Sequence, residues 1–270
     1  MTKKNILLTG IPRSGTSLLL SLLNKEQHLC FSEPPWLKNL KIASDNAKEL
    51  TINLKHKIET LRKDIKQNQA IEMVFKKNTS QIPDNYFSRE NSGIKNTRET
   101  RSVVLPKDQA NAAFIIKANA LFTANIEALN ASNEWSLIAI IRNPVAVLMS
   151  WRSVNIASSK GRVKTVEKYS EELQFIGRQE PLLKRQVLLL NWYFKQFQKL
   201  DAKQVIYYEQ LIKDPQKQIF KSFDTELSEN IKLHSKNQRP EYNQNEREVI
   251  LESIEKYGSY IKEFYPDYSV

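Results

Sequence analysis

The stretch NILLTGIPRSGTSLLLSLL near the start of the chain constrains the fold more than any other part of the sequence. Residues 5–10 form a short apolar run that ends in a glycine, which is the pattern of a buried parallel strand. Thr16 and Ser17 then begin a leucine-rich segment with the character of a helix. A strand, a glycine loop and a helix in this order present backbone N–H groups and the positive end of a helix dipole. We therefore expect an anion to bind at this loop.

The rest of the chain alternates between apolar runs typical of buried strands and segments with helical periodicity. Residues 45–72 have the pattern of a long amphipathic helix, and residues 76–109 are polar and are expected to be irregular. Strands are predicted at 113–119, 135–144 and 203–211. One helix is predicted between the first two of these strands, and others directly after Pro144, at 179–199 and at 246–264. This alternation predicts one α/β domain over residues 1–270, a three-layer sandwich with a central parallel sheet flanked by helices.

The charge of the chain indicates which partners to expect. There are 41 Lys and Arg residues against 30 Asp and Glu, so the formal net charge of +11 favours an anionic ligand or a basic solvated face. We find no nucleic-acid-binding module, and no apolar run is long enough for a membrane span or a signal peptide. The single cysteine, Cys30, excludes an intramolecular disulfide, and the three histidines lack metal-ligand spacing. We expect a cytoplasmic protein without metal, nucleic acid or membrane contacts, whose oligomeric state the sequence does not predict.

The loop has the glycine spacing of a nucleotide-binding P-loop, but its cation is displaced. Gly10 and Gly15 have the separation of the Walker A pattern, whereas Thr16 stands where that pattern requires a lysine. Arg13, inside the loop, supplies a cation instead. A site without the Walker lysine is poorly suited to a triphosphate with its magnesium, so we expect a smaller phospho-anion as the ligand.

Three segments resemble motifs of the PAPS-dependent sulfotransferases, which use 3′-phosphoadenosine 5′-phosphosulfate (PAPS) and release 3′-phosphoadenosine 5′-phosphate (PAP). GIPRSGTSLLLSLL resembles their phosphosulfate-binding loop, P-[KR]-[ST]-G-[ST]-[ST] followed by a helix. IIRNPVAVLMSW contains Arg142 and, eight residues later, Ser150, the spacing at which the family grips the 3′-phosphate of the nucleotide. VIYYEQLIKDPQ resembles a late segment that would place Tyr208 near the adenine and Glu209 against the loop.

The resemblance implies roles for further residues. The leaving 5′-phosphate would be held by Arg13, Ser14, Gly15, Thr16 and Ser17, and the sulfuryl oxygens by Lys117. Two positions after that lysine, animal cytosolic members carry a catalytic histidine, but this chain has Asn119, whose amide cannot act as a base. Lys236 and Arg239 fall where members often bring cations to the 3′ end of the nucleotide, although a solvated basic loop is an equal interpretation.

The base must then come from elsewhere. Some branches, including the tyrosylprotein type, use a glutamate just past the first helix, and Glu33 lies in this region. Its carboxylate could take the acceptor proton if burial raises its pKa toward neutrality. His28, interpreted as a surface residue on the turn after the helix, is the alternative base.

The sequence leaves three hypotheses for the function. The leading one is sulfuryl transfer from PAPS, without metal, to a small-molecule acceptor in secondary metabolism, as in the small bacterial natural-product enzymes that the chain resembles. Polar guanidinium alkaloids such as saxitoxin or cylindrospermopsin are one acceptor class. Residues 40–110, largely unmatched by the family motifs, are expected to be a helical and loop insertion that forms the acceptor pocket or a lid. The alternatives are a magnesium-dependent P-loop kinase or NTPase, and a non-catalytic basic anion-binding protein.

Overall fold

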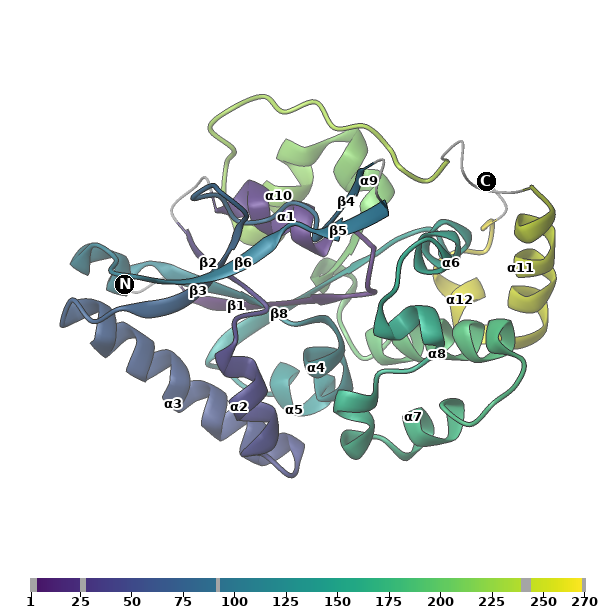
Figure 1. Ribbon diagram of the computed structural model, residues 1–270, viewed down its shortest axis with the longest axis horizontal. Coiled ribbons are helices and arrows are strands. Elements are labelled where there is room, and N and C mark those ends of the chain that lie inside the picture. Colours follow the sequence, from purple (N-terminus) through teal and green to yellow (C-terminus); the bar gives the residue numbers. More distant parts are fainter. Residues whose placement is uncertain (1–3, 25–27, 91–92, 239–243, 269–270) are drawn as a thin grey trace.

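The computed structural model describes residues 4–24, 28–90, 93–238 and 244–268. Its central sheet contains five parallel strands in the spatial order β2-β7-β1-β8-β9 (Figure 1). These strands are β1 (Asn5–Gly10), β2 (His28–Ser32), β7 (Ala113–Lys117), β8 (Trp135–Ile141) and β9 (Val205–Tyr207). The predicted strands at 5–10, 113–119 and 135–144 are confirmed, as is the central parallel sheet.

Helices cover both faces of the sheet, so the predicted three-layer architecture is confirmed (Figure 1). One face is covered by α1 (Thr16–Leu23), α9 (Tyr208–Lys213) and α10 (Pro215–Phe223). The other is covered by α3 (Ala47–Lys66), α4 (Asn119–Ala124), α5 (Ile126–Asn130) and α8 (Leu182–Phe197). The remaining helices are α2 (Trp36–Ile42), α6 (Pro144–Arg152), α7 (Glu171–Ile176), α11 (Gln244–Tyr257) and α12 (Ser259–Phe264). Short 3₁₀ helices are η1 (Lys107–Asn111), η2 (Ala157–Lys160), η3 (Lys164–Tyr169) and η4 (Ala202–Gln204).

The parallel register gathers the ends of four strands at one edge of the sheet. Ser32 at the end of β2 pairs with Lys117 at the end of β7, and Gly10 at the end of β1 pairs with Ile140 of β8. The apolar side chains of these strands, such as Leu7 and Leu8, are fully buried, because helices pack on both faces. Residues that directly follow the strands therefore meet at the carboxyl edge, which is where parallel α/β sheets bind ligands.

The expectation of an irregular segment at 76–109 was wrong. Three strands lie in this region: β6 (Arg98–Val103), which pairs with β3 (Ile71–Lys76) at its start, and β4 (Phe87–Glu90), which pairs with β5 (Gly93–Asn96). The strands of the second pair are only four residues long, and side chains of β6 alternate between half-buried and exposed positions. Such short, polar strands carry little hydrophobic periodicity, and the prediction relied on that signal.

Three further element boundaries differ from the prediction. The long helix predicted at 45–72 ends at Lys66, and Ile71 already belongs to β3. The C-terminal helix is interrupted at Gly258, which separates α11 from α12. Strand β9 ends at Tyr207, so Tyr208 begins helix α9 instead of lying on the strand.

Candidate active site

The loop between β1 and α1 has a backbone that only certain residues can adopt. Gly15 has a φ of 98°, and a Cβ atom added there would lie 2.8 Å from Cδ2 of Tyr208. The glycine is therefore needed both for its backbone conformation and for the close approach of the tyrosine ring. Arg13 also has a positive φ, 75°, as has Glu33, 47°. Non-glycine residues in this region of the backbone map are uncommon and often occur at functional sites.

The loop offers several donors that the described part of the chain does not use. The backbone N–H groups of Gly15, Thr16 and Ser17 donate to no described residue, as is usual for the first turn of a helix. Thr16 and Ser17 also line the pocket described below, and no hydroxyl contact is found for either among the described residues. Together these groups form a cradle for an anion at the N-terminus of α1.

Ser14, by contrast, is committed to the protein. Its hydroxyl donates to the carbonyl oxygen of Ile140 at 2.8 Å, and its backbone N–H donates to the carbonyl of Ile11 at 2.9 Å. The side chain is fully buried. Ser14 therefore fixes the loop to strand β8, and its hydroxyl does not face the pocket.

Arg13 connects the two motifs that the sequence analysis paired. Its Nε donates to the hydroxyl of Ser150 on α6 at 3.2 Å, and its backbone carbonyl accepts from Nη1 of Arg142 at 3.0 Å. Arg142 directly follows β8, and Asn143 begins α6 as its N-cap, with Pro144 at the first helical position. The loop and the second motif thus form one connected group.

Tyr208 and Glu209 hold this group in place from α9. The guanidinium carbon of Arg142 lies 4.6 Å from the centroid of the Tyr208 ring, and the tyrosine hydroxyl accepts from the backbone N–H of Lys236 at 3.2 Å. Glu209 accepts from the backbone N–H of Asn143 at 2.9 Å and from the hydroxyl of Tyr265 at 2.8 Å. The tyrosine lines the pocket and the glutamate supports it from behind.

The loop at residues 231–238 approaches the same group. Arg142 donates through Nη2 to the carbonyl of Lys236 and through Nε to the side-chain oxygen of Asn237, at 2.8 Å in the second contact. The side chain of Lys236 lines the pocket and is exposed. Arg239, predicted beside it, lies outside the described residues.

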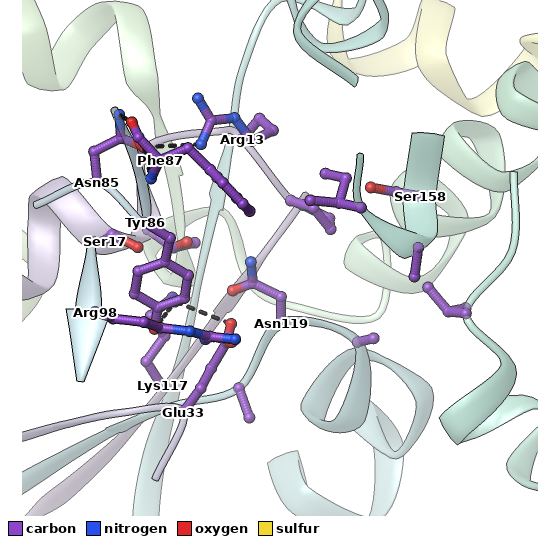
Figure 2. A pocket seen from close by; sticks show the side chains of 18 of the residues that line it. Arg13, Ser17, Glu33, Asn85, Tyr86, Phe87, Arg98, Lys117, Asn119 and Ser158 are labelled. Atoms are coloured by element: carbon purple, nitrogen blue, oxygen red, sulfur yellow. Dashed lines mark hydrogen bonds and ion pairs between the residues drawn. The ribbon is translucent and has the colours of Figure 1, made fainter. Parts of the chain in front are cut away.

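A second cluster surrounds Glu33, which follows β2, a strand that the sequence analysis did not predict. One carboxylate oxygen accepts from Nζ of Lys117 at 3.0 Å and the other from Nη1 of Arg98 at 3.3 Å. Lys117 also donates to the hydroxyl of Tyr86 at 2.9 Å (Figure 2). That hydroxyl lies 2.6 Å from Oγ of Ser32. Glu33 and Lys117, which the sequence analysis named for separate roles, are therefore in direct contact.

The charges around Glu33 act against the pKa change that the sequence analysis required. Burial favours the neutral acid, but the charges and hydrogen bonds of Lys117 and then Arg98 outweigh it and lower the pKa of Glu33. In the sequence analysis the role of Glu33 as the base was conditional on a pKa raised by burial, and this condition is not met because two cations contact the carboxylate. For Lys117, burial opposes the charged form, yet Glu33 and Tyr86 raise its pKa above the usual value. Both groups are therefore charged at neutral pH.

Three residues of the polar segment reach the site without any motif having identified them. Asn85 accepts from Nη1 of Arg13 at 2.9 Å, Tyr86 contacts Lys117, and Arg98 contacts Glu33. Figure 2 shows Asn85 beside Arg13, and Tyr86 and Arg98 beside Lys117 and Glu33. Since all three come from the small antiparallel pairs or the turn before them, only the three-dimensional packing identifies them.

Asn119 lines the pocket, whereas His28 lies outside it. Asn119 begins α4, lines the pocket, and its side-chain oxygen is buried without a hydrogen-bond donor among the described residues. His28 was interpreted as a surface residue, but it is only 8% exposed at the start of β2, and its Nε2 lies 2.9 Å from the hydroxyl of Thr225. It does not line the pocket, so the structure does not support His28 as the base.

The loop and the Glu33 cluster open into one pocket of about 1610 Å³. Its described lining includes only two acidic residues, Glu33 and Asp84. The basic residues in that lining number twelve: Arg13, Lys38, Lys41, Arg98, Lys117, Arg142, Lys160, Arg162, Lys164, Arg185, Lys232 and Lys236. The volume is larger than that of most small-molecule sites, so it can hold two substrates side by side.

In the described parts of the chain, no group of three or more His, Cys, Asp and Glu residues could hold a metal ion. None of the helices described is both long and apolar enough to cross a membrane.

Comparisons with known proteins give the family. Among solved structures, the chain resembles sulfotransferase STF1 from Mycobacterium tuberculosis H37Rv, with 14% identity, a TM-score of 0.40, and coverage of 95% of this chain and 77% of that one. It also resembles a sulfotransferase from Alicyclobacillus acidocaldarius, with 11% identity, a TM-score of 0.42, and coverage of 97% and 96%. No curated protein matches the chain.

These structural similarities are too weak to carry an argument by themselves. The model of the sulfotransferase family, however, matches residues 5–224, which include the loop, the Glu33 cluster, the Arg142 motif and Tyr208. This match covers more than half of the chain and every element that forms the site's carboxyl edge. The chain therefore belongs to the sulfotransferase family.

Proposed function

We propose that this sulfotransferase transfers the sulfuryl group of PAPS to a hydroxyl or amine of a small-molecule acceptor and releases PAP. The observation that carries the proposal is the connection of the anion cradle at Gly15–Ser17 with Arg13 and Arg142 in one pocket. When bound, PAPS would supply the sulfuryl group and a phosphate leaving group. The loop has Thr16 where the Walker pattern has a lysine, and its cation is supplied by Arg13 instead. It therefore suits this phospho-anion better than a triphosphate.

In this proposal the residues of the loop hold the 5′-phosphate and those of the second motif hold the 3′ end of the nucleotide. The N–H groups of Gly15, Thr16 and Ser17, with the guanidinium of Arg13, would bind the leaving phosphate. Arg142, Lys236 and Tyr208 would contact the nucleotide at its other end. Ser150 and Ser14 would act by orienting Arg13 and the loop, because their hydroxyls already contact the protein.

The Glu33 cluster would perform the chemistry. Glu33 would accept the proton of the attacking hydroxyl or amine, and Lys117 would stabilise the charge on the sulfuryl oxygens. Residues 74–100 supply part of the pocket wall near this cluster, which supports the hypothesis that the 40–110 insertion shapes the acceptor site. The proposal includes a cytoplasmic location, which the single Cys30 favours. It also includes a role in secondary metabolism, which the resemblance of the loop favours.

The proposal is tested by thermal unfolding with PAP and, separately, with ATP and magnesium. A ligand at about 100 times its Kd adds about 2.7 kcal/mol of stability, which raises the Tm of a chain of this size by about 5–10 °C. We expect PAP to do so without metal in the wild type and in Arg178→Ala, an exposed control outside the pocket, but not in Arg13→Ala. Stabilisation by ATP with magnesium alone would instead favour a kinase or NTPase.

A further inference from the structure

Two walls of the pocket carry lysines that the proposed reaction does not use. Helix α2 contributes Lys38 and Lys41, while η2 contributes Lys160 and η3 begins with Lys164. All four line the same pocket as Glu33. None of the four is among the residues proposed to hold the nucleotide, so their charges remain available to the acceptor.

These four ammonium groups have no carboxylate partner among the described residues, whereas neighbouring arginines do. Arg162 forms an ion pair with Glu167 at 2.6 Å, and Arg185 forms one with Glu180 at 2.7 Å. The arginine charges are thus balanced within the protein. The lysine charges are left for water or for a ligand.

Lys41 distinguishes this arrangement from an ordinary solvated basic surface. Lys38, Lys160 and Lys164 are exposed, but Lys41 is half-buried. Burial lowers the pKa of Lys41, Glu33 acts in the opposite direction, and Lys38 lowers it further. Because Glu33 acts on Lys41 without forming a direct ion pair, the partly desolvated cation is unfavourable in the free protein, and an anion bound beside it would remove that cost.

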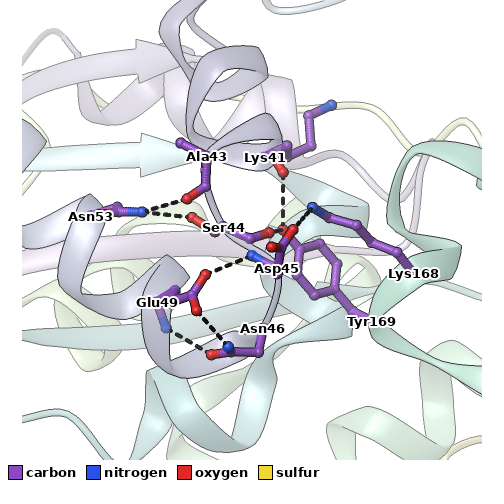
Figure 3. Close-up of polar contacts among 9 residues, drawn as sticks. All are labelled: Lys41, Ala43, Ser44, Asp45, Asn46, Glu49, Asn53, Lys168 and Tyr169. Atoms are coloured by element: carbon purple, nitrogen blue, oxygen red, sulfur yellow. Dashed lines mark hydrogen bonds and ion pairs between the residues drawn. The ribbon is translucent and has the colours of Figure 1, made fainter.

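The backbone around Lys41 is fixed to η3 by direct contacts. The hydroxyl of Tyr169, at the end of η3, donates to the carbonyl of Ser44 at 2.9 Å and to that of Lys41 at 3.4 Å. Lys168 lies 3.6 Å from a carboxylate oxygen of Asp45 in the same turn. Figure 3 shows these contacts and shows the side chain of Lys41 pointing away from them. These contacts therefore tie the segment that carries Lys41 to the segment that begins with Lys164.

We propose that the acceptor is an anionic small molecule, which carries a carboxylate, sulfate or phosphate group as well as the hydroxyl or amine that is sulfated, and that Lys41 is its main charged contact. This inference rests on the proposed sulfuryl transfer. An anionic acceptor differs from the guanidinium alkaloids considered on the basis of the sequence, because the same lysines would repel a cationic acceptor.

The test uses phenols that share one hydroxyl and one ring but differ in charge: 4-hydroxyphenylacetate and 4-hydroxybenzenesulfonate (anionic), 4-methylphenol (neutral) and tyramine (cationic). Binding of each to the PAP-saturated protein is measured by calorimetry, so the readout does not require turnover. We expect an anionic probe to bind at least tenfold more tightly than the neutral probe, and tyramine to bind most weakly.

Two variants of the same residue and one control isolate the role of Lys41. Lys41→Gln should weaken anion binding about tenfold without changing that of 4-methylphenol, and Lys41→Glu should favour tyramine. Lys203→Gln, at an exposed position outside the pocket, should change nothing. Equal binding of all probes, no binding of any probe, or an unchanged preference in Lys41→Gln would overturn the inference. If PAP itself fails to stabilise the wild type, the proposed function fails first, so the two failures are distinguishable.

Discussion

The contact between Glu33 and Lys117 can be tested independently of catalysis by measuring stability. Lys117 is 1% exposed, and its charge is compensated by Glu33, whose side chain is 34% exposed. Replacing one partner of a fully buried ion pair costs about 3–5 kcal/mol. Because water reaches Glu33 and the Tyr86 hydroxyl remains on Lys117, we expect Glu33→Gln to lower the free energy of unfolding by about 1–3 kcal/mol.

A double-mutant cycle with Lys117→Met separates the pair from its surroundings. Equilibrium urea unfolding of the wild type, both single variants and the double variant should give a coupling energy of about 1–2 kcal/mol. The exposed pair of Lys195 and Glu172, at 2.9 Å, serves as the matched control, for which about 0.2–1 kcal/mol is expected. A coupling below about 0.5 kcal/mol for Glu33 and Lys117 would be within additivity and would refute the pairing.

The same cycle has a defined dependence on pH. The pKa of Glu33 is lowered from its ordinary value of 4.5, so its contribution is present above pH 4.5 and is lost as the pH falls through the folded-state pKa. The pKa of Lys117 is raised from 10.5, so its contribution is present below pH 10.5 and is lost as the pH rises through its folded-state value. The stability difference between the wild type and Glu33→Gln should therefore be constant near neutral pH and shrink in acid below pH 4.5.

Three further predictions concern single residues of the site. Gly15→Ala should cost about 1–3 kcal/mol of stability in urea unfolding and abolish the thermal shift with PAP, because its Cβ would clash with Tyr208 at a positive φ. Tyr86→Phe should slow sulfuryl transfer about 10- to 100-fold, the equivalent of a lost hydrogen bond to a charged group, and leave the PAP shift unchanged; full activity would exclude a role for its hydroxyl. His28→Gln should lower the Tm but retain transfer with PAPS, and loss of activity in a folded variant would return His28 to consideration as the base.

The sequence predicted those parts of the fold that carry a strong local pattern. Strands β1, β7 and β8 are apolar runs buried on both faces, and α6 begins at a proline, so each has an unambiguous signal. Strand β2, with the residues HLCFS, was not predicted because five residues without alternation do not distinguish a strand from a turn. As a result Glu33 was expected after a helix, whereas it follows a strand.

The site was predictable only where a motif fixes the position of a residue relative to the sheet. Arg13 and Arg142 follow adjacent strands, so their proximity follows from parallel topology. Tyr86 and Arg98 belong to a region of short polar strands and reach Lys117 and Glu33 through tertiary packing, which has no counterpart in local sequence. The direction of the pKa change at Glu33 depends on these neighbours, so the sequence alone could not show that their charges outweigh the effect of burial.

The lowered pKa of Glu33 is compatible with its proposed role as the base. At neutral pH a carboxylate with this pKa is ionised, so it is ready to accept a proton, although it is a weaker base than one tuned toward neutrality. In the proposed reaction, a proton that moves onto Glu33 removes the negative charge that now compensates Lys117. The ammonium group, which is buried and still held by Tyr86, would then be free to stabilise negative charge on the sulfuryl oxygens. Weak basicity at Glu33 and electrostatic stabilisation by Lys117 are thus coupled through one contact, which explains why a pocket rich in cations keeps a carboxylate at this position.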